Sequence, residues 1–137
     1  MSSFVVDTSA LIAILADEAE ALTFSRAILS ADAVSVSAAT VHEANCVVAR
    51  GKIGKRENSV GELLDDFGIL SVAFTSEHAE AAKEAYLSFG RGSGHPAQLN
   101  MGDCFSYALA KTRNLPLLFK GDDFVHTDLR PALAVNS

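Results

Sequence analysis

Short apolar segments alternate with longer segments of helical periodicity along this chain of 137 residues. Segments with the length and composition of buried strands are SFVV (3–6), AVSVS (33–37), ILSVAF (69–74) and LPLLF (115–119). Helical patterns cover residues 8–16, 18–29, 39–51, 57–67, 77–89 and 100–111. This alternation predicts an α/β fold in one domain over residues 1–137, with a mainly parallel central sheet and helices on both faces.

Acidic residues stand where these predicted elements begin or end. Asp7 follows the first strand, Glu43 lies in the first turn after the second, and Asp103 begins a late helix. Asp122 and Asp123 come just after the last strand. Ligands of open parallel sheets bind outside the carboxyl ends of the strands, near the switch in strand order. We therefore expect these acids to face one edge of the sheet.

Each acid also has a local structural interpretation. Asp7 fits a helix N-cap, and Asp103 lies three residues after Asn100, where a helix start favours negative charge. Thr40 and Glu43 have the spacing of a capping box, and the last two acids suit a turn. Taken singly, these roles explain each residue as well as a functional role does.

Taken together, the local roles explain less, because clustered carboxylates repel one another unless a hard divalent cation neutralises them. Ligand sets made only of oxygen select Mg²⁺ or Mn²⁺ over zinc. Such an ion lowers the pKa of an attacking water and offsets charge on phosphate oxygens, as phosphodiester hydrolysis requires. The acids therefore predict a metal-dependent hydrolase of phosphodiesters.

Composition restricts how the chain can meet its partners. The formal charge is -6, so general attraction to polyanions is excluded and any nucleic-acid contact must be local. The most basic stretch, ARGKIGKRE, carries Arg50, Lys52, Lys55 and Arg56 and fits a solvated helix end and loop. Hydrophobic residues make up 49% of the chain, which predicts apolar surface that meets a partner.

Neither the cysteines nor the histidines predict a separate site. Cys46 and Cys104 lack C-x-x-C spacing and are expected to be buried free thiols; a zinc site from His42 and Cys46 would lack two ligands. The four histidines form no recognisable nucleophilic dyad and are expected at the surface or in loops. They are His42, His78, His95 and His126.

The chain is expected in the cytoplasm. Its longest apolar run, residues 10–16, is too short to span a bilayer. The first residues have neither a basic region nor a small-residue cleavage site.

Four motifs in order along nearly the whole chain resemble the PIN-domain ribonucleases, specifically the VapC toxins of bacterial toxin–antitoxin pairs. The motifs are VVDTSALIAIL, VHEANCVVA, MGDCFSYALAK and LLFKGDDFVHTDL. The resemblance implies a PIN-like fold and a Mg²⁺- or Mn²⁺-dependent endoribonuclease. It also implies inhibition by a small antitoxin encoded beside it, and a homodimer.

The same resemblance assigns roles to residues. Asp7, Glu43 and Asp103 match the first three metal-binding acids of the family. Asp122 is favoured as the fourth, with Asp123 as the competitor. Thr8 and Ser9 follow the first acid, where their hydroxyls can hold Asp7 or a metal-bound water, or can cap the helix. Because target choice depends on loops and basic residues, Arg91, His95 and Lys120 are expected substrate contacts, with His126 a further one.

Other functions remain to be weighed against a nuclease. A haloacid-dehalogenase-like phosphatase would need an aspartate where Ser9 stands, and a response-regulator receiver would need an acidic pair near the first strand. Both are disfavoured. A PIN-like module that only binds RNA or protein stays open, although such a module has little reason to keep clustered carboxylates.

Overall fold

The computed structural model describes residues 2–51 and 59–134. Helices and strands alternate along most of this length, as the pattern predicts. In chain order the elements are β1 (Ser3–Val6), α1 (Thr8–Leu15), α2 (Ala21–Ser30), β2 (Ala33–Ser37), α3 (Ala38–Arg50), α4 (Ser59–Phe67), β3 (Leu70–Val72), α5 (Ser76–Phe89), α6 (Met101–Arg113) and β4 (Leu117–Leu118).

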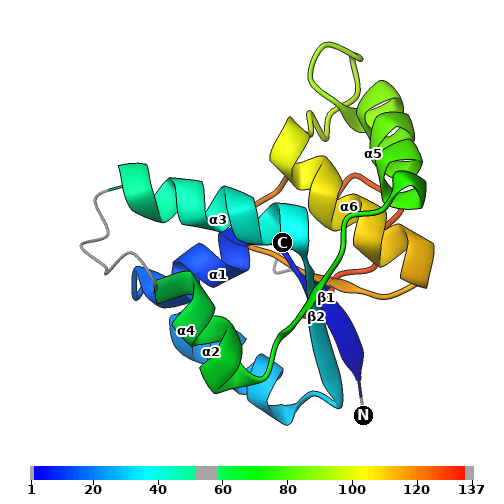
Figure 1. The fold of residues 1–137 in the computed structure, drawn as a ribbon. Coiled ribbons are helices and arrows are strands. Elements are labelled where there is room, and N and C mark those ends of the chain that lie inside the picture. Colours follow the sequence, from blue (N-terminus) through cyan, green and yellow to red (C-terminus); the bar gives the residue numbers. More distant parts are fainter. Residues whose placement is uncertain (1, 52–58, 135–137) are drawn as a thin grey trace.

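The four strands form one parallel sheet in the order β3-β2-β1-β4. Figure 1 shows its two central strands, β1 and β2, side by side. The chain adds β2 and β3 on one side of β1 and then returns to add β4 on the other. The switch in strand order therefore lies between β1 and β4. Because all four strands are parallel, the segments that follow β1, β2 and β4 leave the sheet at one edge, where ligands of such sheets bind.

Helices cover both faces of the sheet, as predicted. Side chains alternate along β1, so Phe4 and Val6 face one core and Val5 faces the other. The first core contains apolar residues of α1, α2, α3 and α4, and the second contains residues of α5 and α6. Figure 1 shows α5 and α6 grouped apart from α1, α2 and α4.

Two predicted strands are shorter than their apolar segments. Residues 69–74 contribute only β3, and Phe74 lies beyond it with its ring packed edge-on against Phe105 at 5.3 Å. Residues 115–119 contribute only β4, because the partner strand β1 ends at Val6 before the chain turns into α1. The first two strands have the predicted bounds. Of the helix predicted over 57–67, the part from Ser59 is confirmed and its start lies outside the described residues.

The chain after β4 returns alongside this strand. The backbone N–H of Leu117 donates to the carbonyl of Arg130 (2.9 Å), and Ala132 N–H donates back to the Leu117 carbonyl (2.8 Å). The Tyr107 hydroxyl, from α6, donates to Asp128 Oδ1 at 2.7 Å. These bonds fix residues 128–132 beside β4 and against α6.

Three local predictions are wrong. Ser37, not Thr40, caps α3, because the Ser37 hydroxyl oxygen accepts from Ala39 N–H, and Glu43 is thereby free of a capping role. His78 is buried, and it forms a capping box with Thr75 at the start of α5. Cys46 is exposed, whereas Cys104 is a buried free thiol as predicted.

Two composition-based predictions can be compared with the described part of the chain only. Of the basic stretch, Arg50 ends α3, while Lys52, Lys55 and Arg56 lie outside the described residues. Among the helices within 2–51 and 59–134, none combines the length and the apolar character needed to cross a membrane.

Candidate active site

Asp7 lies at the centre of the predicted edge and is 3% exposed. It is the N-cap of α1, and its Oδ2 accepts hydrogen bonds from Ser9 N–H (3.0 Å) and Ser9 Oγ (2.7 Å). Its Oδ1 accepts from Ser106 Oγ at 2.6 Å, from the middle of α6. Burial raises the pKa of this carboxyl, and the hydrogen bonds from Ser106 and Ser9 offset part of the rise.

A second hydroxyl stands behind Ser106. Thr40 Oγ1, from the first turn of α3, lies 3.2 Å from Ser106 Oγ, and both residues are fully buried. Because the Ser106 hydroxyl gives its proton to Asp7, Thr40 is the donor in the remaining contact. The chain of hydroxyls therefore orients one oxygen of Asp7 from two helices.

Glu43 reaches the same edge from α3. Thr8 Oγ1 donates a short hydrogen bond to Glu43 Oε1. The pKa of Glu43 is raised, first by burial and also by the charge of Asp7, while the Thr8 hydrogen bond lowers it. The carboxylate fits because residue 102 is a glycine: a Cβ there would stand 1.8 Å from Glu43 Oε2. Because Gly102 has no side chain, α6 leaves space there for the Glu43 carboxylate.

Asp103 caps α6 and also lies beside the other acids of the candidate metal site. Asn100 and Asp103 form a capping box, in which Asp103 Oδ2 accepts from Asn100 N–H (3.0 Å) and Asn100 Oδ1 accepts from Asp103 N–H (2.8 Å). The pKa of Asp103 is raised to about 7, first by burial and then by the charges of Asp7 and Asp123. The cap takes up Oδ2, so Oδ1 is the oxygen that remains for a ligand.

The structure separates the two candidates for the fourth acid. Asp123 lies close enough to Asp103 for its charge to raise the pKa of Asp103. Asp122 instead lines a pocket with Lys120 on the other side of the loop. Gly121 precedes both with φ +99°, a conformation that favours glycine and turns the chain sharply after β4. The neighbour of the acid cluster is therefore Asp123.

Only some of the predicted supporting and substrate-binding residues lie at the acids. Ser9 holds Asp7, whereas Thr8 holds Glu43. The backbone N–H of Lys120 donates to Ser9 Oγ at 2.9 Å, and its ammonium group pairs with Glu18 and Glu20 at 3.0 and 3.2 Å. The other predicted contacts lie away from these bonds. His95 packs edge-on against Phe89, and Arg91 and His126 are exposed.

The cluster supplies donors that suit a hard divalent cation. All its donors are oxygens, and the charge of Asp7 raises the pKa of Glu43 and Asp103, a repulsion that a cation would relieve. Within the described residues, no three acidic, histidine or cysteine side chains already converge closely enough to hold an ion. The oxygen donors and their negative charge suit a divalent cation, and the carboxylates would move closer together when they bind it.

Three positioning residues were not predicted from the sequence. Ser106 and Thr40 carry hydroxyls at positions that face the core, where a polar residue needs a partner. Gly102 stands inside the first turn of a helix, where glycine is unfavourable without a packing reason. These features of the sequence could have identified the three residues.

Comparisons with known proteins agree with this geometry. The PIN domain family model matches residues 4–129. Ribonuclease VapC42 of Mycobacterium tuberculosis is 44% identical over 128 residues, which cover 93% of this chain and 98% of that protein. Ribonuclease VapC28 of the same species is 45% identical over 129 residues, covering 94% and 97%.

A solved structure has the same fold at lower identity. The crystal structure of M. tuberculosis VapC20, described as a Sarcin-Ricin loop cleaving toxin, aligns with a TM-score of 0.70 at 19% identity, covering 93% of this chain and 99% of that one. With the match of the family model and these identities over nearly the full length, the chain belongs to the PIN-domain family and, within it, to the VapC ribonucleases.

Proposed function

We propose that this protein is a metal-dependent endoribonuclease, the toxin of a toxin–antitoxin pair, with Asp7, Glu43, Asp103 and Asp123 as its metal-binding acids. The observation that carries the proposal is the grouping of these acids at the carboxyl edge of the sheet, where the charge of Asp7 raises the pKa of both Glu43 and Asp103. Relatives at 44–45% identity are named ribonucleases. A module that only binds would gain nothing from this repulsion.

The chain's own groups have separate tasks in this chemistry. A bound Mg²⁺ or Mn²⁺ would lower the pKa of an attacking water and offset charge on the phosphate oxygens. Ser9 and Ser106 orient Asp7 and offset part of the effect of its burial, because hydrogen bonds to a carboxylate favour its charged form. Thr8 fixes Glu43, and the cap of α6 fixes Asp103. The ligands are thus held before the ion or the substrate arrives.

We propose a small antitoxin as the protein partner. The outer face of α2 exposes Leu22 (61%) and Leu29 (66%), which are two turns apart on one stripe. An amphipathic helix can cover such a stripe. A structure titled as a toxin-antitoxin complex from Klebsiella pneumoniae has the same fold, with a TM-score of 0.68 at 15% identity, covering 96% of this chain and 99% of that one. The homodimer stays a prediction.

The fourth acid can be tested on total RNA with Mg²⁺ or Mn²⁺ against EDTA. Asp123→Asn should lower the cleavage rate by more than the roughly 10- to 100-fold typical of losing a supporting group at a metal site. Asp122→Asn should lose much less, because Asp122 lines the neighbouring pocket and does not contribute to the raised pKa of Asp103. Equal losses in both variants would contradict the assignment, and metal-independent cleavage would contradict the mechanism.

Gly102→Ala should lower the cleavage rate by about 100-fold, because the new Cβ displaces Glu43 and misplacement of a reacting group has costs of that order. The fold should survive, since alanine is the better helix former. Glu43→Asp provides the control. If Gly102 acts only through Glu43, adding Gly102→Ala to Glu43→Asp should lower the rate little further. Additive losses would show a separate role for Gly102.

The raised pKa of Asp103 predicts that the stability of the metal-free protein depends on pH. The folded-state pKa of about 7 exceeds the ordinary value of 3.8, so the folded protein binds this proton more tightly than the unfolded chain. The associated stability is present at low pH and is lost as the pH rises from about 4 to about 7. Asp103→Asn keeps a capping oxygen but cannot ionise. The Tm of this variant should therefore rise relative to the Tm of the wild type as the pH increases from about 4 to about 7.

The same melting curves test the metal. At a Mg²⁺ concentration about one hundred times Kd, the free energy of unfolding of the wild type should rise by roughly 2.7 kcal/mol, and that of Asp103→Asn should rise by less. A wild type without a metal response, paired with a variant less stable at every pH, would reduce Asp103 to a capping residue.

The antitoxin surface can be tested by co-expression with the small protein encoded beside this chain. The two products should co-purify, and Leu22→Lys with Leu29→Lys should weaken that association, because lysines cannot be buried in an apolar contact without a partner. Leu87→Lys, at an equally exposed leucine of α5, is the matched control and should co-purify normally. Loss in the control alone would move the interface to α5.

A further inference from the structure

Two side chains with the chemistry of metal ligands lie outside the acid site, on the outer side of α3. His42 and Cys46 are four residues apart, so they share one face of this helix. Both are exposed. The sequence predicts a buried Cys46, whereas the structure places its thiol where an ion in solution can reach it.

The separation of the two side chains suits a single ion. Cys46 Sγ lies 3.6 Å from His42 Nε2. A tetrahedral zinc ion that binds a thiolate at about 2.3 Å and an imidazole nitrogen at about 2.0–2.1 Å places the sulfur and the nitrogen about 3.6 Å apart. The pair therefore has the spacing of two neighbouring ligands of one ion.

The packing of α3 does not explain why these two residue types stand there. The helix buries Thr40, Ala44 and Val48 and leaves His42 and Cys46 on an exposed side. Among the described residues, neither side chain has a polar partner other than the contact between them. That contact is exposed, so water competes with it and it stabilises the helix little.

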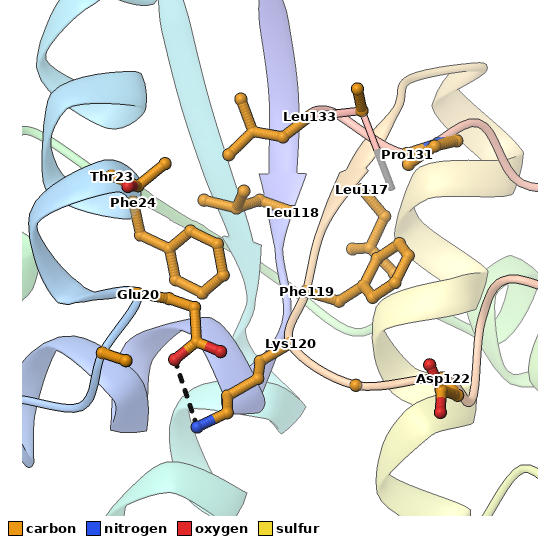
Figure 2. Close-up of a pocket in the computed structure, with 13 residues that line it drawn as sticks. Glu20, Thr23, Phe24, Leu117, Leu118, Phe119, Lys120, Asp122, Pro131 and Leu133 are labelled. Atoms are coloured by element: carbon orange, nitrogen blue, oxygen red, sulfur yellow. Dashed lines mark ion pairs between the residues drawn. The ribbon is translucent and has the colours of Figure 1, made fainter. Parts of the chain in front are cut away.

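The pocket beside the acids has a different character. It lies between α2 and the segment that begins with β4 and has a volume of about 610 Å³. Figure 2 shows Phe24, Leu118 and Phe119 in its walls, and Glu20 there forms an ion pair with Lys120 Nζ at 3.2 Å. The described residues that line it include neither cysteine nor histidine. Nitrogen and sulfur ligands therefore meet on α3 and not in this pocket.

We propose that His42 and Cys46 form a binding site for a thiophilic divalent cation such as Zn²⁺, with water in the remaining coordination positions. Imidazole and thiolate ligands select ions of this class, whereas the oxygen donors at the sheet edge select Mg²⁺ or Mn²⁺. Binding forms the bonds from the metal to Sγ and Nε2 and releases the thiol proton to water. The site takes no ligand from the acids, so the inference does not depend on the proposed ribonuclease function.

Two protein ligands make a weaker site than the four of a structural zinc centre, but they leave open positions for water, as catalytic zinc sites do. The formal charge of -6 favours the approach of any cation. Two ions of different class would then bind through α3, a hard one at Glu43 and a thiophilic one at the adjacent His42 and at Cys46.

An absorbance titration with Co²⁺ tests the site. Co²⁺ takes the place of Zn²⁺ at such ligands, and its bond to a thiolate gives a charge-transfer band that oxygen and nitrogen ligands do not give. The full chain is titrated in excess Mg²⁺, so that the acids do not compete for Co²⁺, and with a phosphine reductant that keeps the thiols free. The wild type should show the band, and added Zn²⁺ should remove it.

Variants identify the ligands. Cys46→Ser should abolish the band, whereas Cys104→Ala should keep it because Cys104 is buried. His42→Ala should raise the Kd for Co²⁺ by about tenfold or more, because it removes one of two linked ligands. His126→Ala changes an exposed histidine elsewhere in the chain and is the matched control, which should leave the Kd unchanged.

Several results would overturn the site. They are the absence of the band in the wild type, a band that survives Cys46→Ser, and equal Kd values for the wild type and His42→Ala, since Cys46 would then bind the ion alone. If Asp7→Asn removed the band, the ion would belong to the acids and the inference would fall. Cleavage of RNA with Mg²⁺ or Mn²⁺ is measured separately, so the proposed function can stand or fail independently.

Discussion

Burial of the Asp7 carboxylate is the constraint on which the rest of the site depends. A charge taken out of water is tolerated only when hydrogen bonds replace its hydration. Here Ser9 and Ser106 provide those bonds, and they come from two different helices. Ser9 also accepts from the backbone of Lys120, which follows β4. Satisfying one buried acid therefore joins the end of β1, the middle of α6 and the loop that carries Asp123.

The helix-cap and metal-ligand interpretations of the acids are compatible. Asp7 caps α1 and Asp103 completes a capping box, yet both have raised pKa values because they are buried and share one edge. For Asp103 the cap takes up one oxygen of the carboxylate, and the second can face a ligand. The chain thus uses helix starts to fix acids at the edge of the sheet, where a flexible loop would hold them less well.

What the sequence predicts here is mainly local. The first two strands, the start of α6 and the N-cap at Asp7 depend on neighbouring residues, and these predictions are confirmed. The bond between Ser106 and Asp7 joins positions 99 residues apart, so no local pattern indicates it. Gly102 matters only because Glu43 approaches it in the fold. The choice between Asp122 and Asp123 depends on how the backbone turns at Gly121, which two adjacent acids in a sequence cannot reveal.

The acidic character of the chain limits how the protein can bind RNA. With a formal charge of -6, this protein cannot use the broad phosphate attraction that supplies most non-specific RNA binding. The acids at the sheet edge add to that repulsion until a cation binds. Affinity for RNA must then come from the cation itself and from contacts that do not depend on charge. Because contacts to bases depend on the base and attraction to phosphate does not, an acidic ribonuclease of this kind is expected to discriminate among RNA sequences.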